Sequence, residues 1–493
     1  MTAPLQFRLL AVRSHHERRA RHIPIRKRGQ MTQVDITRIE EVFGAIDAAA
    51  DGLVSDLQSF LRQPSVIDNK QECEACASFT AQLIRDAGFD AEVIGTSYSN
   101  PMVFGASEQA PDKPTLLIAG HYDVVAPGPD SAWDHPPFEA HLSDGDILAR
   151  GASDPKGNVV AGVKAGQILR EVTGDIPVNL KFLLEGNDER PQGEVLRFAE
   201  ENKELLEADA VLLLDAGFTR DGCSPVHLGT AGSLAVELVA TTGTREPYFI
   251  WTQIIPDAAY RLVWALASLK DANEQVAVDG FYDHVRRPDE AAERVLEAIP
   301  WEDEAERQFW GIRDYVTGAH GSEAVRRLLY EPTCSIHGLS PGMARPNSDS
   351  LIPVEARAWV NFHLVPDQDP ADILEKLRSH LDATGFEDIV IEPPWRAFAP
   401  MGGSPQSPLG EALLRAADAA GVGSYLLPNS FEFGDKWCVL GDILGVEGAM
   451  IGIGDPDRRA HFPNEHISVD YFIRGTKWIA AAYAEYATTQ SGR

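Results

Sequence analysis

The sequence predicts an α/β fold: a layered domain with a mostly parallel central sheet, interrupted by an inserted α+β domain. Two observations support this prediction. Short apolar runs alternate with helical segments between residues 114 and 217, as in parallel sheets covered by helices. From about residue 226 apolar and polar positions alternate, which is typical of half-exposed antiparallel strands, and the first pattern returns after about residue 405.

The first part of the chain opens with two helical segments and continues as the alternating region. Apolar residues at helical spacing predict helices over 36–66 and 71–88, the second ending at Gly88. The alternating region then predicts, in order, strand 114–120, helix 157–170, strand 178–186, helix 193–206 and strand 210–217. We expect these strands to be buried in one largely parallel sheet.

The middle of the chain predicts a second kind of layer. Its elements are, in order, strand 226–240, helix 256–269, a charged helix-rich stretch at 280–330, strand 356–366, helix 369–385 and strand 388–393. This is the pattern of a split βαβ, ferredoxin-like layer that carries an insertion. We therefore predict an inserted domain at 228–398. Residues 31–227 and 399–493 form the other domain, whose last elements are helix 407–420, strand 449–454 and helix 469–487.

Composition and charge exclude several classes of partner. The 493 residues carry a net charge of −30, which argues against nucleic acid and anionic membranes. No apolar run approaches the ~20 residues of a membrane span. Five cysteines make no disulfide scaffold and fit a reduced, cytoplasmic compartment.

The first thirty residues differ from the rest in charge. Residues 1–30 hold eight Lys or Arg residues against one acid, Glu17. We expect a disordered basic tail, or a start assigned too far upstream of Met31; a polyanion-binding or targeting arm is the alternative.

Polar side chains follow the ends of the predicted strands. His121 comes directly after strand 114–120, and Asp188 and Glu189 follow strand 178–186. Asp215 lies near the end of strand 210–217. Open α/β sheets bind their ligands at the carboxyl ends of the strands, so we expect these side chains to lie together. Adjacent carboxylates repel each other unless a cation lies between them. The stretch FLLEGNDE at 182–189 therefore indicates a cation site.

Further residues extend this set. Asp123 follows His121 by two positions, and such a carboxylate can hold an imidazole ring and fix its tautomer. Asp154 precedes Pro155, and an Asp–Pro bond adopts the cis form at modest cost, so a carboxylate on this rigid kink is suited to bridge two ions. His461 precedes another proline kink in AHFPNEH. Each feature alone is common in structural roles, but together these nitrogen and oxygen donors suit two zinc-like ions that share one carboxylate.

Seven motifs occur along the chain in a fixed order. They are GHYDVV (120–125), Trp133 with PPF (136–138), ARGASDPKG (149–157), LLEGNDE (183–189), LLLD (212–215), HLVPDQDP (363–370) and AHFPNE (460–465). As an ordered set they resemble the co-catalytic di-metal hydrolases, a family that includes glutamate carboxypeptidase, aminoacylase, acetylornithine deacetylase, succinyl-diaminopimelate desuccinylase and carnosinase-like dipeptidases. The resemblance covers about 36–487, and the insertion at 280–330 is most similar to the dipeptidase branch.

The resemblance implies a site and a mechanism. One ion would be held by His121, Asp154 and Asp215, and the other by Asp154, Glu189 and His461. Asp123 would orient His121, and Asp188 falls where the family has its general base. The implied reaction is attack on an amide carbonyl by a hydroxide that bridges two divalent ions, with zinc expected and manganese or cobalt as alternatives. The inserted domain would be a lid that also forms a homodimer.

The substrate-facing residues depart from the family pattern. The base position holds Asp188, one methylene shorter than the usual Glu. The stretch 244–257 lacks the family's oxyanion-supporting histidine, and Tyr248 is a candidate replacement. His363 stands where the family has a carboxylate-clamping arginine. The loop FEFGDKW at 431–437 is also altered, and Lys436 is a candidate substrate-binding residue.

Three functions remain open at this stage. The first is a metal-dependent amide hydrolase for a small, non-standard substrate that lacks the usual carboxylate. The second is an ordinary dipeptidase or carboxypeptidase whose carboxylate clamp has moved to Arg245, Arg345 or Lys436. The third is a non-catalytic binding protein, although the retention of five metal-binding side chains argues against it.

Overall fold

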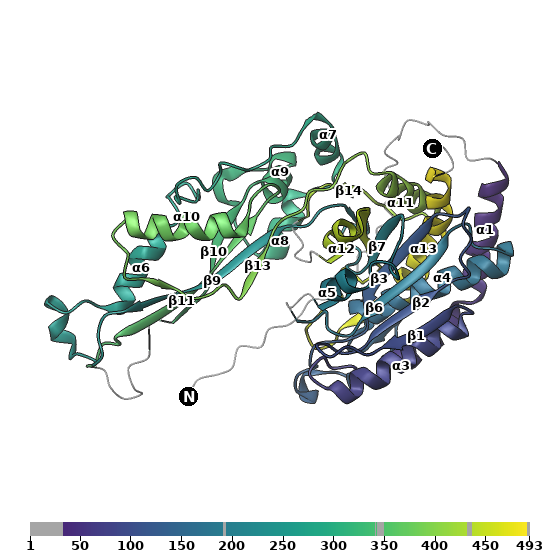
Figure 1. Ribbon diagram of the computed structural model, residues 1–493, viewed down its shortest axis with the longest axis horizontal. Coiled ribbons are helices and arrows are strands. Elements are labelled where there is room, and N and C mark those ends of the chain that lie inside the picture. Colours follow the sequence, from purple (N-terminus) through teal and green to yellow (C-terminus); the bar gives the residue numbers. More distant parts are fainter. Residues whose placement is uncertain (1–32, 191–193, 341, 343–349, 431–435, 491–493) are drawn as a thin grey trace, which may run out of the picture.

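The computed structural model describes residues 33–190, 194–340, 342, 350–430 and 436–490. The basic arm, Arg345 and most of the altered loop at 431–437 lie outside these residues, and the side chain of Lys436 does too. Figure 1 shows two groups of elements side by side, each built around its own sheet. No helix in this part of the chain combines the length and apolarity that crossing a membrane requires.

The larger sheet has eight strands in the order β1-β2-β6-β3-β7-β15-β8-β14. The four central strands β6, β3, β7 and β15 are parallel, whereas β1 and β2 pair antiparallel at one edge and β8 runs antiparallel to β15. The prediction of a mostly parallel sheet therefore holds for its centre. The strands are β1 (Asp90–Ile94), β2 (Met102–Ala106), β3 (Thr115–His121), β6 (Asn179–Glu185), β7 (Ala210–Leu214), β8 (Val226–His227), β14 (Leu426–Leu427) and β15 (Glu447–Ile451).

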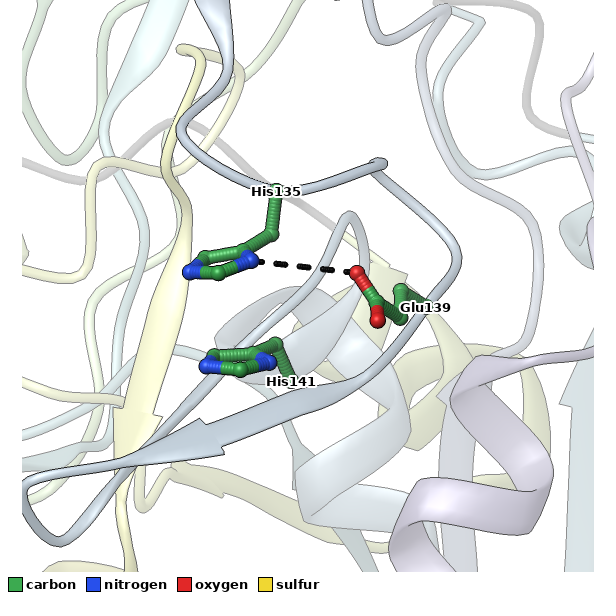
Figure 2. Close-up of side chains that lie close together, drawn as sticks. All are labelled: His135, Glu139 and His141. Atoms are coloured by element: carbon green, nitrogen blue, oxygen red, sulfur yellow. Dashed lines mark ion pairs between the residues drawn. The ribbon is translucent and has the colours of Figure 1, made fainter.

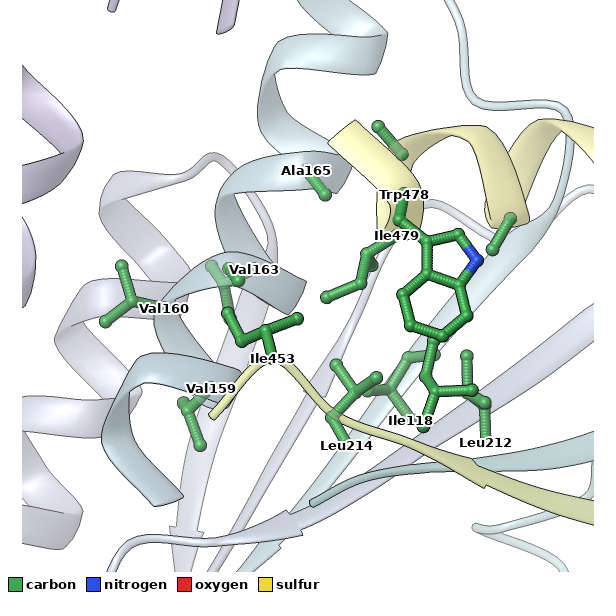
Figure 3. Close-up of a cluster of buried hydrophobic side chains, with 14 of the residues drawn as sticks. Ile118, Val159, Val160, Val163, Ala165, Leu212, Leu214, Ile453, Trp478 and Ile479 are labelled. Atoms are coloured by element: carbon green, nitrogen blue, oxygen red, sulfur yellow. The ribbon is translucent and has the colours of Figure 1, made fainter. Parts of the chain in front are cut away.

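Helices cover both faces of this sheet (Figure 1). Successive strand residues point to opposite faces, so Ile118 packs into one helix layer and Leu117 into the other. Figure 3 shows part of the first layer, where Ile118 and Leu212 lie near Trp478 of α13. The first layer contains α1 (Gln33–Ala48), α2 (Ala50–Leu61), α3 (Lys70–Asp86), α4 (Gly157–Thr173), α11 (Pro408–Ala419) and α13 (Val469–Gln490), and the second contains α5 (Glu194–Glu201) and α12 (Lys436–Leu444).

The second sheet is antiparallel and lies within residues 232–398. Its strands run in the order β10-β11-β9-β12, and β13 also pairs with β9. They are β9 (Gly232–Thr241), β10 (Thr333–Ser340), β11 (Glu355–Leu364), β12 (Val390–Ile391) and β13 (Arg396–Phe398). Helices α6 (Ala258–Ser268) and α10 (Pro370–Ala383) share its apolar core. This agrees with the predicted α+β layer, and the segregation of the strands supports the domain boundaries at 228 and 398, which we keep as a proposal.

The insertion at 280–330 contains the predicted helices. They are α7 (Glu290–Ala298), α8 (Asp303–Trp310) and α9 (Ser322–Tyr330). Leu296 of α7 and Leu329 of α9 form an apolar cluster with Leu427 of β14, which belongs to the larger sheet. The insertion therefore packs against the larger sheet as well as extending the second group of elements.

The remaining elements are short. A three-stranded sheet joins β16 (His466–Ser468), β5 (Asp146–Leu148) and β4 (His141–Ser143). Short helical turns are η1 (Asp130–Ala132), η2 (Ala152–Lys156), η3 (Phe249–Gln253) and η4 (Val316–Gly318). The predicted helix over 36–66 is in fact two helices, α1 and α2, because Ala49 leaves helical geometry with φ −92° and ψ 1°.

Candidate active site

Five segments place the predicted ligands at one edge of the larger sheet. Strands β6, β3 and β7 are parallel neighbours, so the residues that end or follow them meet at the same edge. His121 ends β3, Glu189 follows β6 by four positions, and Asp215 follows β7 directly. Asp154 comes from η2, and His461 from the connection between β15 and β16.

The structure brings five predicted ligands together in two groups that share Asp154. In each group, the donor atoms lie within 4.8 Å of one another. His121 Nε2 lies 3.3 Å from Asp154 Oδ1 and 4.0 Å from Asp215 Oδ2. His461 Nε2 lies 3.3 Å from Asp154 Oδ2 and 3.0 Å from Glu189 Oε2. Asp154 thus turns one oxygen toward each histidine, as a carboxylate that bridges two ions would.

The donor atoms fit divalent ions of the zinc class. His121 Nε2 and Glu189 Oε1 are buried, and neither has a hydrogen-bond partner among the described residues. A buried polar atom without a partner is costly, whereas an ion in each donor group would give both atoms a partner. Imidazole nitrogen and carboxylate oxygen are ligands that zinc accepts readily.

The charges of the cluster also call for a cation. Burial raises the pKa of Asp215 to about 7, and the nearby charge of Asp154 adds to this rise. Hydrogen bonding with Asp154 and Glu189 raises the pKa of His461 to about 10. Both shifts favour the protonated form of a group that lies among other carboxylates. The cluster therefore holds protons that metal ions would replace.

Asp123 fixes three functional groups at once. Its Oδ1 lies 3.3 Å from His121 Nδ1, which leaves Nε2 facing the other carboxylates. The backbone N–H of Asp188 donates to Oδ1 and that of Glu189 to Oδ2, each at 3.1 Å. The sequence predicted the contact with His121, but it gave no sign of the two backbone contacts, because these depend on how the turn after β6 folds.

The turn after β6 and the kink at Asp154 have local causes. A Cβ at Gly186 would lie 2.2 Å from Tyr122 Oη, so only glycine lets the turn pass this buried ring. The Tyr122 hydroxyl donates to the carbonyl of Pro101. The peptide bond between Asp154 and Pro155 is cis, as the sequence allowed.

Sequence reasoning missed a buried ion pair behind the bridging carboxylate. Arg150 donates to Glu465, whose carboxylate also accepts from the backbone N–H groups of Gly151, Ser153 and Asp154. The pair therefore holds the backbone of η2 in place and with it Asp154. Arg150 stands in the motif ARGASDPKG and Glu465 in AHFPNE, and their opposite charges inside these two motifs were the available signal.

The predicted substrate residues are more scattered. His363 is half-buried on β11, where burial lowers its pKa to about 4. Tyr248 precedes η3 and is 47% exposed; its described contacts are with Phe249 and Leu351 rather than with the metal ligands. Lys436 begins α12, but its side chain lies outside the described residues.

Comparisons with known proteins agree with this geometry. Beta-Ala-His dipeptidase of Rattus norvegicus is 23% identical over 486 residues, which cover 92% of this chain and 97% of that protein. Cysteinylglycine-S-conjugate dipeptidase of Corynebacterium striatum is 23% identical over 454 residues, with coverage of 88% and 94%. The crystal structure of an M20 family metallo-carboxypeptidase, Sso-CP2 from Sulfolobus solfataricus, has a TM-score of 0.79 and 28% identity, with coverage of 88% and 99%.

These findings confirm the resemblance of the motifs, including the likeness to dipeptidases, and the non-catalytic alternative is not kept. The model of "Peptidase family M20/M25/M40" matches residues 117–485, which include every ligand of the cluster. The chain therefore belongs to the M20/M25/M40 peptidase family of metal-dependent enzymes that hydrolyse C–N bonds.

Proposed function

We propose that the chain is a dipeptidase-type hydrolase that cleaves one amide bond of a small, peptide-like molecule with the help of two divalent ions. The observation that carries this proposal is the pair of donor groups joined by Asp154. His121 and Asp215 would complete one ion site, and Glu189 and His461 the other. Zinc is the ion we expect, with manganese or cobalt as alternatives.

Asp188 is the proposed general base. The two ions, when bound, would lower the pKa of a water molecule and stabilise negative charge on the carbonyl oxygen. Asp188 would take a proton from that water and pass it to the leaving amine. Its Oδ2 lies 3.8 Å from His121 Nε2, so the carboxylate borders the metal cluster, and Asp123 holds its backbone in that place.

The substrate distinguishes two versions of this function. The named relatives are dipeptidases, which supports a dipeptide with a free carboxylate. A substrate without that carboxylate is the second candidate, and His363 favours it. Because burial lowers the pKa of His363 to about 4, the ring is uncharged at neutral pH and offers no positive charge to a carboxylate. If the substrate is a dipeptide, another residue must bind its carboxylate, and the candidates are Arg245, Arg345 or Lys436.

A matched substrate panel tests both versions. The zinc-loaded protein is given dipeptides and the same dipeptides with a C-terminal amide, and the released amino acids are measured. A dipeptidase with a relocated clamp will prefer the free acids, whereas an enzyme for substrates without the carboxylate will cleave the amides at least equally fast. A protein that holds two ions per chain and hydrolyses neither set, nor any other small amide, would overturn the proposal.

The compartment and the assembly are further parts of the proposal. All five cysteines are free thiols, which supports a reduced, cytoplasmic compartment. We also propose a homodimer that forms through residues 228–398.

A further inference from the structure

Two histidines and one glutamate gather where a loop leads into β4, on the loop and on the first residue of the strand, apart from the ligands described above. They are His135, Glu139 and His141, here called the His–Glu–His cluster (Figure 2). One donor atom of each side chain lies within 4.8 Å of the others. The sequence analysis did not single out these residues, because two histidines six positions apart form no recognised metal motif.

The three side chains present unused donor atoms to one another. The imidazole rings of His135 and His141 are stacked, with centroids 3.5 Å apart and planes 11° apart. His135 Nδ1 lies 3.8 Å from Glu139 Oε2, and Figure 2 shows a nitrogen of each ring directed to the side where the carboxylate lies. Within the described chain, no hydrogen bond engages any of the three side chains.

The backbone beneath the cluster is held by helix α2 and by Arg62, the residue that follows it. Gln58 Nε2 donates to the carbonyl of Ala140 at 2.9 Å, and Arg62 Nε donates to the carbonyl of Glu139 at 3.1 Å. Ala140 is buried and has φ 55°, a left-handed conformation that non-glycine residues adopt only where the surroundings impose it. This bend separates Glu139 from His141 and lets both side chains face His135. The donors are therefore on a fixed backbone.

We infer that the His–Glu–His cluster is a further metal site, which binds one ion such as Zn²⁺, Ni²⁺ or Cu²⁺. Two imidazoles and one carboxylate are the ligand types that these ions prefer, and three protein ligands leave a coordination position for water. Binding requires both rings to turn out of their parallel stack so that their lone pairs converge. The His135 side chain is 37% exposed and that of Glu139 48%, so solvent leaves room for this rotation.

An ion here would also affect the segment that carries His461. Asp134, the neighbour of His135, forms two hydrogen bonds with Asn464. The Asp134 N–H donates to Asn464 Oδ1 at 2.8 Å, and Asn464 Nδ2 donates to Asp134 Oδ2 at 3.1 Å. Asn464 lies three residues after His461. A bound ion would therefore restrict the motion of residues 134–141. Through the two hydrogen bonds with Asn464, it would also restrain the segment that carries His461.

Metal counting in matched variants tests the inference. The full-length protein, a His135→Ala/His141→Ala variant and a His320→Ala control are equilibrated with buffered Zn²⁺, and the bound zinc per chain is measured by mass spectrometry. His320 is an exposed histidine beside Asp303 and Asp314, outside any donor group, and so matches the loss of a surface imidazole. The double variant should bind one ion fewer per chain than the other two proteins. Equal counts in all three would overturn the inference.

A second variant guards against misfolding and against failure of the catalytic proposal. Glu139→Gln keeps the size of the side chain and should weaken binding of this one ion at least ~10-fold, without the loss of a ring. Its competition with Mn²⁺ is also informative, because imidazole-rich sites prefer Zn²⁺ strongly over Mn²⁺. The inference would be contradicted if the site bound Mn²⁺ as readily as Zn²⁺. It would also be contradicted if Glu139→Gln left the zinc affinity of the site unchanged. Because every comparison is a difference from wild type, the result does not depend on how many ions the proposed active site holds.

Discussion

Asp188 and Glu189 are neighbours in the sequence, and the structure gives their carboxylates different surroundings. Glu189 belongs to a donor group with Asp154 and His461, whereas Asp188 lies outside both donor groups at the edge of the cluster. These surroundings agree with the proposal that Glu189 holds an ion and Asp188 moves a proton. The different roles of these two carboxylates are the hypothesis about single residues that is simplest to test.

Replacement of Asp188 by Asn should separate catalysis from metal binding. The amide cannot accept a proton, so we expect kcat to fall by ~10²–10⁴-fold while both ions stay bound. Asp188→Glu is the matched control, since it keeps the base and gives it the side-chain length usual in the family, and it should retain activity. Turnover on the best amide substrate and zinc content per chain are the two measurements. An unchanged kcat in Asp188→Asn would show that another group is the base.

Replacement of Asp123 by Asn should weaken metal binding, although Asp123 belongs to neither donor group. The carboxylate now accepts hydrogen bonds on both of its oxygens. In the amide, an NH₂ group would replace one of these oxygens and face an N–H donor, which disturbs the ring of His121 or the turn at Glu189. Loss of such a supporting carboxylate costs ~10–100-fold in metal affinity. Zinc titration of the metal-free protein in a chelator buffer measures this, with Asp130→Asn on η1 as the control. An affinity within twofold of wild type would contradict this role for Asp123.

At the scale of elements, the turn after β6 is fixed by packing against Tyr122. A Gly186→Ala substitution would place a methyl group 2.2 Å from Tyr122 Oη, so the turn must shift and carry Asp188 and Glu189 with it. Overpacking of this kind costs ~1–3 kcal/mol of stability. We expect a lower unfolding midpoint and a loss of kcat/KM, measured by chemical denaturation and by initial rates.

Gly44→Ala is the control for the Gly186 prediction. It adds the same methyl group in helix α1, where nothing lies within 4 Å, and alanine favours a helix over glycine by ~1 kcal/mol. This variant should therefore be at least as stable as wild type. If Gly186→Ala behaves like Gly44→Ala, the contact with Tyr122 does not restrict the turn.

The ends of the central strands were predictable from the sequence, and the edges of the sheets were not. Strand β3 was expected to end next to His121, where a continuous apolar run stops, and it ends at His121 itself. Strand β7 was expected over 210–217, and it ends at Leu214, directly before Asp215. By contrast, β1 was not predicted, since its side chains are mostly exposed and carry no apolar run. The break at Ala49 between α1 and α2 was missed because the apolar spacing continues through it.

At the scale of the molecule, the sequence predicted the central elements of each sheet but not what covers their outer surfaces. The clearest example is a set of exposed aromatic side chains on η3 and α6. The sequence alone does not decide whether aromatic residues pack inside the protein or bind a partner. Trp251 is 50% exposed, Tyr260 61% and Trp264 57%. Large apolar side chains exposed on neighbouring elements are typical of protein–protein interfaces.

These side chains predict that the protein is a dimer in solution and that α6 contributes to the interface. Trp264→Asp would place a charge in the predicted interface, and loss of an aromatic anchor there costs ~2 kcal/mol or more, about 30-fold in the dimer dissociation constant. Trp310→Asp is the matched control, because Trp310 is 65% exposed on α8, away from η3 and α6 in the sequence. Sedimentation velocity over a range of micromolar concentrations should show dimers for wild type and Trp310→Asp and a shift to monomers for Trp264→Asp. A monomeric wild type would refute the dimer, whereas an unchanged dimer in Trp264→Asp would place the interface on another face, because an aspartate cannot be buried at the centre of an interface without a partner charge.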